Sequence, residues 1–179
     1  MTNILYYTEV TSPIGPLTLF SSDKGLMSIK FAGTAESVPA FKVWAVRYKG
    51  ADIKLEENAS VFKEEIQQLR EYFEGTRTEF DVAYDLEGTP FQQAVWKALI
   101  EVPYGRTASY KEIAAAAGSE KAVRAVGNAN NKNPIPIMIP CHRIIGSNGA
   151  LVGYGGGLDK KTYLLEIEKE QTAQERKVR

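Results

Sequence analysis

The stretch Ser109-Tyr110-Lys111-Glu112-Ile113-Ala114-Ala115-Ala116-Ala117-Gly118-Ser119 decides how the second half of this 179-residue chain folds. Its first serine and the glutamate three residues later have the spacing of a capping box, which opens a helix over residues 110–117, and Gly118 ends that helix. Ser119 then caps a further helix, expected over about residues 120–130. Two short helices joined by a tight Gly-Ser turn predict a helix-turn-helix.

Further elements flank this pair of helices. Upstream, Thr89-Pro90 is an N-cap followed by proline at the first helical position, and it predicts a helix that ends at the turn Val102-Pro103-Tyr104-Gly105. Downstream, residues 146–149 predict a hairpin-like turn, and residues 153–157 a glycine-rich loop that can present backbone N–H groups to a ligand. A last helix is expected over about residues 160–171, followed by a frayed polar tail.

The second helix of the motif has two unlike faces. Steps of about 100° per residue place Ala122, Val123 and Val126 together, facing the partner helix. The opposite face is basic, bears an amide and has small neighbours; it consists of Lys121, Arg124, Ala125 and Asn128. Such a face is typical both of a solvated helix surface and of a surface that binds DNA.

The chain has one cysteine and one histidine, side by side in an apolar run over residues 134–145. A thiolate is a strong nucleophile and an imidazole can take the proton of a thiol, so Cys141 and His142 are candidates for a catalytic pair. Adjacent side chains on an extended chain point to opposite faces, so the pair needs a bend or a bridging water, and Pro140 favours a bend. A small buried core cysteine is the alternative interpretation.

Composition limits the class of protein. Hydrophobic residues make up 44% of the chain, which is enough for one or two folded domains, and no apolar run has membrane-spanning length. The polar N-terminus lacks the features of a secretory signal, so we expect a protein of the cytoplasm, or of the nucleus in a eukaryote, that does not bind membranes. One cysteine and one histidine cannot form a zinc site of the usual Cys/His type, and we expect no metal.

The charged residues are unevenly distributed along the chain. Residues 1–88 hold 9 Lys/Arg and 14 Asp/Glu, a net −5, whereas residues 89–179 hold 13 and 8, a net +5. A net charge of zero by itself argues against a protein that binds nucleic acids in general. If the protein does bind a polyanion, the basic second half is the part expected to contact it.

The first half predicts an antiparallel sheet with a helix. β-Branched and aromatic runs over residues 4–10, 17–20 and 26–31 are separated by turn residues, as in a small meander. Residues 41–48 are compatible with a strand or a short helix. Apolar residues at helical spacing, with acids in the first turns, predict a helix over residues 58–74.

Several motifs of the second half occur together in one known family. They are Thr89-Pro90-Phe91-Gln92, Val102-Pro103-Tyr104-Gly105, Ser109-Tyr110, Arg124-Ala125-Val126-Gly127-Asn128-Ala129, Asn133-Pro134, Ile139-Pro140-Cys141-His142-Arg143-Ile144-Ile145 and Gly156-Gly157-Leu158. With them the chain resembles the O6-alkylguanine-DNA alkyltransferases, also called methylated-DNA–protein-cysteine methyltransferases. The resemblance covers about residues 85–170 well, and the first 85 residues only in size and general character.

The resemblance implies an α+β fold of two domains. Residues 1–85 would form an RNase H-like module, the antiparallel sheet with its helix, which supports the second domain. Residues 86–179 would form a helical winged helix-turn-helix domain that binds DNA and carries the active-site cysteine. Some relatives hold a zinc ion in the first domain, but this chain lacks the ligands for it.

In this family the alkyl group passes irreversibly from O6 of a damaged guanine to a cysteine. The resemblance therefore implies a protein that acts once and uses no cofactor. By residue correspondence Cys141 is the nucleophile, His142 acts on it through a water, and Glu168 holds His142. Tyr110 would donate to the guanine ring, and Asn133 would brace the site.

The same correspondence implies a pocket for the flipped guanine. The backbone carbonyls of Cys141 and Ile144 would read the guanine amino group, and the N–H of Gly155 would lie near O6. Relatives more often carry serine in place of this glycine, so a hydroxyl contact is absent here while a backbone contact survives. The implied pocket residues are Ile144, Tyr154, Gly155, Gly156 and Lys161.

The implied partner is double-stranded DNA that contains O6-alkylguanine, bound by a monomer. The second helix of the motif would enter the minor groove, and Arg124 would fill the stack that the flipped guanine leaves. The implied DNA-binding residues are Lys121, Arg124, Ala125, Gly127, Asn128 and Ala129. The range of alkyl sizes and the acceptance of O4-alkylthymine stay open.

Two other functions stay open on the residues alone. A cysteine hydrolase with a Cys141-His142-Glu168 triad would form a thioester and turn over repeatedly. An alkyltransferase-like protein would flag damage without repairing it. Such proteins usually have tryptophan in place of the cysteine, so Cys141 favours repair.

Overall fold

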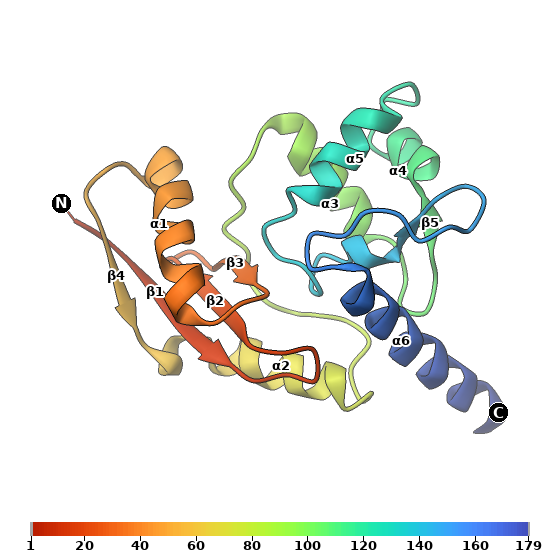
Figure 1. Ribbon diagram of the computed structural model, residues 1–179, viewed down its shortest axis with the longest axis horizontal. Coiled ribbons are helices and arrows are strands. Elements are labelled where there is room, and N and C mark those ends of the chain that lie inside the picture. The colour runs from red at the N-terminus through yellow and green to blue at the C-terminus, as the bar shows by residue number, and fades with distance from the viewer. Residues whose placement is uncertain (1, 179) are drawn as a thin grey trace. The chain divides into compact units, whose positions relative to one another are not determined.

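The computed structural model describes residues 2–178, and the chain divides into two compact units, Met1–Glu87 and Gly88–Arg179. The first unit is a sheet with helices, and the second is mainly helical (Figure 1). Each unit has its own buried residues.

The sheet of the first unit is a meander extended by one parallel strand. Strands β1 (Asn3–Val10), β2 (Leu17–Ser21) and β3 (Leu26–Lys30) pair antiparallel, as predicted, and β4 (Ile53–Glu57) pairs parallel with β1, which gives the order β3-β2-β1-β4. The sequence prediction missed β4. Its five residues contain only two large apolar ones, which is too short a pattern to distinguish a strand.

Helix α1 (Thr34–Lys49) connects β3 to β4, which lie at opposite edges of the sheet. The ambiguous residues 41–48 are therefore helical. Phe41 of this helix stacks on Phe20 of β2 with ring centroids 3.9 Å apart. The core on this face of the sheet comprises Leu5, Phe20, Met27, Phe41, Ala45 and Ile53.

The helix predicted over residues 58–74 is present in two parts. A 3-10 turn η1 (Ala59–Phe62) comes first, and its Asn58 cap accepts a hydrogen bond from the N–H of Ser60. Helix α2 (Lys63–Phe73) follows and ends before Gly75, whose φ of +78° few other residues adopt readily.

The second unit begins with the helix predicted at Thr89-Pro90, followed by the two helices of the predicted helix-turn-helix. Helices α3 (Pro90–Ile100) and α4 (Tyr110–Ala116) each start with a complete capping box, Thr89 with Gln92 and Ser109 with Glu112. Helix α5 (Val123–Asn131) packs against both. The indole N–H of Trp96 on α3 donates to the carbonyl of Ala129 on α5 at 2.9 Å, which ties the two helices together.

The expected start of α5 was wrong. Residues 120–122 form a turn, in which the N–H of Ala122 bonds to the carbonyl of Ser119 at 2.9 Å, and the helix begins only at Val123. Ser119 is therefore the first residue of a turn and does not cap α5. No side chain caps this helix.

The chain then passes through a long connection to the last elements. The 3-10 turn η2 (Cys141–Arg143) leads into β6 (Ile144–Ile145), which pairs parallel with β5 (Ala108–Ser109). The predicted turn after β6 is confirmed, since the Gly149 N–H bonds to the Gly146 carbonyl.

Helix α6 (Leu158–Val178) is longer than the sequence predicted. The tail after residue 171 was expected to fray, but it continues the helix to residue 178. This segment is rich in good helix formers, and Arg176 and Lys177 in the last turn interact favourably with the helix dipole.

Candidate active site

The segment that precedes Cys141 is folded tightly and is almost completely buried. The Ile139 N–H bonds to the carbonyl of Ile135 at 2.9 Å, and the Cys141 N–H bonds to that of Ile139 at 2.8 Å. Ile137, between them, has a φ of 75°, a strained conformation for a β-branched residue. After Pro140 the chain turns into η2, so the bend expected at this proline is present.

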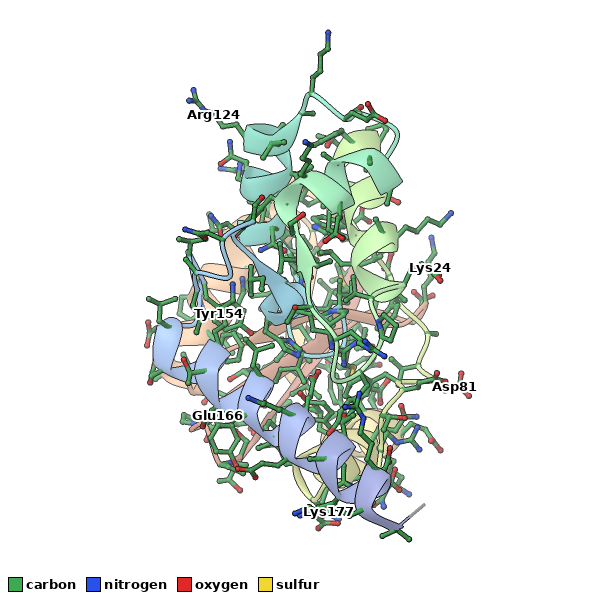
Figure 2. The ribbon with its side chains drawn as sticks, turned by 90° about the vertical axis from the view of Figure 1, so that its right-hand side faces the viewer. Lys24, Asp81, Arg124, Tyr154, Glu166 and Lys177 are labelled. Carbon is green, nitrogen blue, oxygen red and sulfur yellow. The ribbon has the colours of Figure 1, made fainter. Side chains whose placement is uncertain are left out.

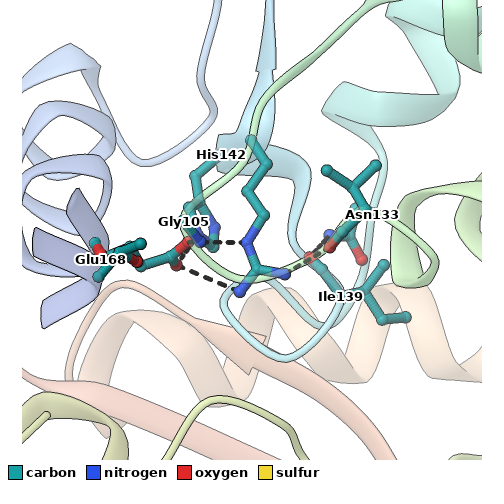
Figure 3. Close-up of polar contacts among 8 residues, drawn as sticks. Gly105, Asn133, Ile139, His142 and Glu168 are labelled. Carbon is teal, nitrogen blue, oxygen red and sulfur yellow. Dashed lines mark hydrogen bonds and ion pairs between the residues drawn. The ribbon is translucent and has the colours of Figure 1, made fainter. Parts of the chain in front are cut away.

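Asn133 holds the two ends of this segment together. Its side-chain amide donates to the carbonyl of Ile139 at 2.8 Å, and its Oδ1 accepts from the N–H of Ile135 at 3.0 Å. Figure 3 shows Asn133 beside Ile139. One side chain therefore fixes the loop that positions Cys141.

His142 and Glu168 form a buried pair between η2 and α6. His142 Nε2 lies 2.6 Å from Glu168 Oε2, and the two side chains are 0% and 1% exposed. Figure 3 shows His142 pointing towards Glu168. Because a carboxylate only accepts hydrogen bonds, Nε2 carries the proton and Nδ1 is the acceptor nitrogen of the neutral ring. Among residues 2–178, nothing hydrogen-bonds to this buried Nδ1.

The surroundings set the protonation state of each group. Burial raises the pKa of the Cys141 thiol to about 11, although a hydrogen bond from Asn133 and the charge of Lys161 oppose this. Burial lowers the pKa of His142; the charges of Arg143 and Lys161 lower it further, and Glu168 opposes them. The resting site therefore holds a thiol beside a neutral imidazole.

Glu168 stays ionised in this environment. Burial alone would raise its pKa, but the hydrogen bonds and positive charge of His142 and Arg143 outweigh burial and lower the pKa to about 2. A buried carboxylate with these partners can stabilise an imidazolium when His142 accepts a proton.

Tyr110 and Lys161 meet at one backbone carbonyl. The Tyr110 hydroxyl donates to the carbonyl of Val152 at 3.1 Å, and the Lys161 ammonium donates to it at 3.2 Å. Lys161 also donates to the carbonyl of Ile144 at 2.5 Å. Lys161 was expected at the mouth of the pocket but is 0% exposed, because its ammonium is satisfied by these carbonyls.

The predicted pocket residues after β6 lie on an irregular loop. Tyr154 is partly buried, and burial raises its pKa well above the ordinary value, with the nearby Cys141 acting in the same direction. Gly155 is exposed, and a Cβ at this position would approach only the Asn131 carbonyl, at 4.0 Å. Gly156 is partly buried.

Most of the residues predicted to bind DNA are exposed on or next to α5. Arg124, Ala125 and Asn128 lie on the open face of the helix, and Figure 2 shows the Arg124 side chain projecting outward. Lys121 is exposed but precedes the helix. Gly127 is partly buried, with its Cβ position 3.9 Å from the Tyr110 ring.

Two expectations about residues of α5 differ from the structure. Ala129 was expected to bind DNA but is only 2% exposed, because it packs inward where its carbonyl accepts the Trp96 indole N–H. Val123 was expected to face the partner helix but is 40% exposed, since it stands at the start of α5 and not in its second turn.

Sequence reasoning missed two groups that complete the site. The Arg143 guanidinium bonds to both oxygens of Glu168, and the Gly105 N–H donates to Glu168 Oε1 at 3.2 Å. The available signal was the charge itself. An arginine inside an apolar run must find a partner when it is buried.

Within residues 2–178, no group of three or more His, Cys, Asp or Glu side chains is arranged to hold a metal ion. In the same part of the chain, no helix combines the length and the apolar character needed to cross a membrane.

The fold and the site define a class of protein, in which a mixed sheet unit accompanies a helix-turn-helix unit that holds a buried Cys-His-Glu group. Residues 5–86 match the family model described as 6-O-methylguanine DNA methyltransferase, ribonuclease-like domain. Residues 90–170 match the model described as the DNA binding domain of the same family. The chain therefore belongs to the 6-O-methylguanine DNA methyltransferase family, and the fold class expected from sequence is confirmed.

Individual relatives agree with this assignment. A methylated-DNA–protein-cysteine methyltransferase of Methanosarcina barkeri is 46% identical over 92% of this chain and 97% of its own. The crystal structure of the Mycobacterium tuberculosis O6-methylguanine methyltransferase has a TM-score of 0.80 at 44% identity, covering 93% of this chain and 94% of that one. A structure of the same mycobacterial protein in complex with DNA has a TM-score of 0.77, with the same identity and coverage.

Proposed function

We propose that this protein repairs O6-alkylguanine in double-stranded DNA by moving the alkyl group to the Cys141 sulfur. The family repairs this lesion by direct transfer to a cysteine, and the chain contains a single cysteine. The observation that carries the assignment is the position of that cysteine. It directly precedes His142, which is paired with the buried Glu168.

The chemistry requires that the buried thiol lose its proton only when the substrate is in place. In the proposed step His142 Nδ1 takes the Cys141 proton through a water, and Glu168 stabilises the resulting imidazolium. The thiolate attacks the saturated alkyl carbon, the S–C bond forms as the C–O6 bond breaks, and the departing guanine takes up one proton in exchange for the one that Cys141 has given to His142. The product is a thioether that water does not cleave, so each molecule acts once without a cofactor.

Recognition of the guanine is assigned to groups that surround Cys141. Burial raises the pKa of Tyr110, and Cys141 acts in the same direction, so its hydroxyl stays protonated and can donate to the ring. It must leave the Val152 carbonyl to do so. The Ile144 carbonyl already accepts from Lys161, but a carbonyl has two lone pairs and can also accept the guanine amino group.

The remaining contacts with the base are assigned to the loop after β6. The Gly155 N–H is placed near O6, where its lack of a side chain leaves only a backbone contact. Tyr154 and Gly156 line the same pocket. Asn133 contributes indirectly, because its hydrogen bonds to Ile135 and Ile139 fix the loop that carries Cys141.

DNA binding is assigned to the open face of α5, in the minor groove. Ala125 and Gly127 are small, so the helix backbone can approach the duplex closely, while Lys121 and Asn128 contact its backbone. Arg124 inserts where the flipped base has left the stack. Unstacking costs a few kcal/mol, which the intercalated side chain partly offsets.

The two domains have separate roles in this proposal, and the protein acts as a monomer. Residues 86–179 bind DNA and carry out the transfer, while residues 1–85 support that domain. The second half carries the net positive charge and the first half the net negative charge, as this division requires.

The test uses duplex DNA with one labelled O6-methylguanine. We expect Cys141→Ala to take up no label and to bind the duplex with an affinity within about twofold of the unmodified protein, because the variant removes only a buried sulfur. Uptake by the variant would contradict the assignment of Cys141. Release of label into solution with repeated turnover would instead favour a cysteine hydrolase.

A further inference from the structure

Arg143 is buried and has no part in the proposed transfer, yet it makes four specific contacts. Its Nε donates to Glu168 Oε1 at 2.8 Å and its Nη2 to Oε2 at 3.3 Å. Its Nη1 donates to the carbonyl of Val102 at 2.7 Å, and its guanidinium carbon lies 5.6 Å from the centre of the Tyr104 ring. The guanidinium therefore joins the turn after α3 to the carboxylate on α6.

With Arg143 in place, both oxygens of Glu168 are occupied. Oε1 accepts from Arg143 and from the Gly105 N–H, and Oε2 accepts from His142 and Arg143. The carboxylate cannot rotate without breaking several hydrogen bonds. Its negative charge is also balanced by one positive charge, so His142 faces a neutral pair and not an isolated anion.

The turn after α3 is built to keep this arrangement. Gly105 has a φ of +75°, and a Cβ at this position would overlap the hydroxyl of Thr172 on α6. A side chain here would have to displace that of Thr172 and adopt a strained φ, so glycine suits the position from which the N–H reaches Glu168. The Val102 carbonyl at the start of the turn fixes the far end of the guanidinium.

We propose that Arg143 is a positioning residue for the alkyl transfer, which holds the Glu168 carboxylate against His142 and balances its charge. The inference rests on the proposed function, because it assumes that His142 accepts the Cys141 proton. Arg143 itself touches neither the thiol nor the substrate in this scheme.

Charge balance has a consequence for the pH range of the reaction. The charged groups that act on His142 are Glu168, Arg143 and Lys161. Tyr104 and Tyr154 lie near the Glu168 carboxylate. Burial has the largest effect on the pKa of His142 and lowers it; Glu168 raises it, and the positive charge of Arg143 acts in the same direction as burial. Removing the charge of Arg143 therefore raises that pKa, and a higher pH is needed before the imidazole is free to accept a proton.

The test compares Arg143→Met and Arg143→Lys with Lys169→Met, a control that removes an exposed charge one residue from Glu168. Single-turnover rates on methylated duplex are measured from pH 5 to 9. We expect the midpoint of the acid limb to move to higher pH in Arg143→Met, because the positive charge that disfavours the imidazolium is gone. Arg143→Lys should keep the midpoint but react more slowly, because it retains the charge without the two-pronged geometry. The control should match the unmodified protein.

A purely structural role predicts a different result. Arg143→Met would then lower the rate by the same factor at every pH, with the midpoint unmoved, and the inference would be overturned. If Arg143→Met shows no cooperative unfolding transition, Arg143→Gln, which keeps N–H donors without charge, takes its place and must show the same upward shift.

Failure of the proposed function can be distinguished from failure of this inference. Because His142 is the only histidine, NMR of its imidazole follows its protonation with pH without DNA. The midpoint of that titration should move to higher pH in Arg143→Met. A protein that takes no methyl group from DNA but shows this shift would contradict the function and support the role of Arg143. An unmoved midpoint in the NMR titration would refute that role.

Discussion

His142 Nε2 lies 2.6 Å from Glu168 Oε2, although the two residues are 26 positions apart in the sequence and both are buried. The contact joins the turn that carries the cysteine to the last helix. It also makes the protonation state of the site part of the stability of the fold, because neither group can exchange its partner for water.

Glu168 should therefore confer a defined acid sensitivity. Its folded-state pKa of about 2 lies below the ordinary value of 4.5, so it stabilises the protein above pH 4.5, and this stabilisation is lost as the pH falls towards 2. The contribution is roughly 3 kcal/mol. We expect Glu168→Gln to be less stable at pH 7 by about that amount and to lose this acid dependence, measured by urea unfolding from pH 7 to 3. A variant that loses stability between pH 4.5 and 3 as steeply as the unmodified protein would contradict this.

The buried thiol should confer the opposite, alkaline sensitivity. The folded-state pKa of Cys141 is raised from 9 to about 11, so its contribution is complete below pH 9 and is lost as the pH rises towards 11. The loss at pH 10 is roughly 1.4 kcal/mol. Cys141→Ala should show a correspondingly flatter decline in unfolding free energy between pH 8 and 10. Equal slopes in the two proteins would mean that the thiol is not protected from solvent.

Arg124 should affect base flipping and not the transfer itself. Arg124→Ala should slow repair of O6-methylguanine in duplex DNA by roughly tenfold or more, since a few kcal/mol of unstacking then lack compensation. Reaction with free O6-benzylguanine should stay within about twofold. Lys111→Ala, which removes an equal charge from α4, serves as the control for electrostatic binding. Equal losses on both substrates would remove Arg124 from the flipping step.

Asn133 should be required for the shape of the Cys141 loop. Asn133→Ala breaks its bonds to Ile135 and Ile139 and leaves two backbone groups without partners, so we expect a loss of roughly 2–4 kcal/mol in unfolding free energy. Asn131→Ala, an exposed neighbour, should change stability by less than about 0.5 kcal/mol. Similar losses of unfolding free energy in the two variants would show that the hydrogen bonds of Asn133 do not stabilise the loop.

Local signals in the sequence predicted the elements whose ends are set by capping. The capping box at Ser109 and the N-cap and proline at Thr89-Pro90 were found because each signal lies within one turn. The helix start predicted at Ser119 was wrong because serine favours turns as well as helix N-caps, and the local sequence does not distinguish the two. The helical tail of α6 was missed because composition alone does not show where a polar helix ends.

The site could be predicted only as far as the family resemblance extended. Cys141 and His142 are adjacent, so their association was evident from the residues. Glu168 was assigned by resemblance, and its contacts with Arg143 and Gly105 depend on three segments that only the fold brings together. The inward position of Ala129 likewise depends on Trp96, 33 residues earlier.

The most direct test of the account is the mass of the tryptic peptide that contains Cys141, measured after reaction with excess O6-methylguanine DNA. Cleavage after Lys132 and Arg143 isolates residues 133–143. The account predicts one added methyl group on the Cys141 sulfur, reaching one equivalent per protein molecule and no further. An unmodified peptide after the DNA has been repaired, or the repair of many equivalents by one molecule, would contradict it.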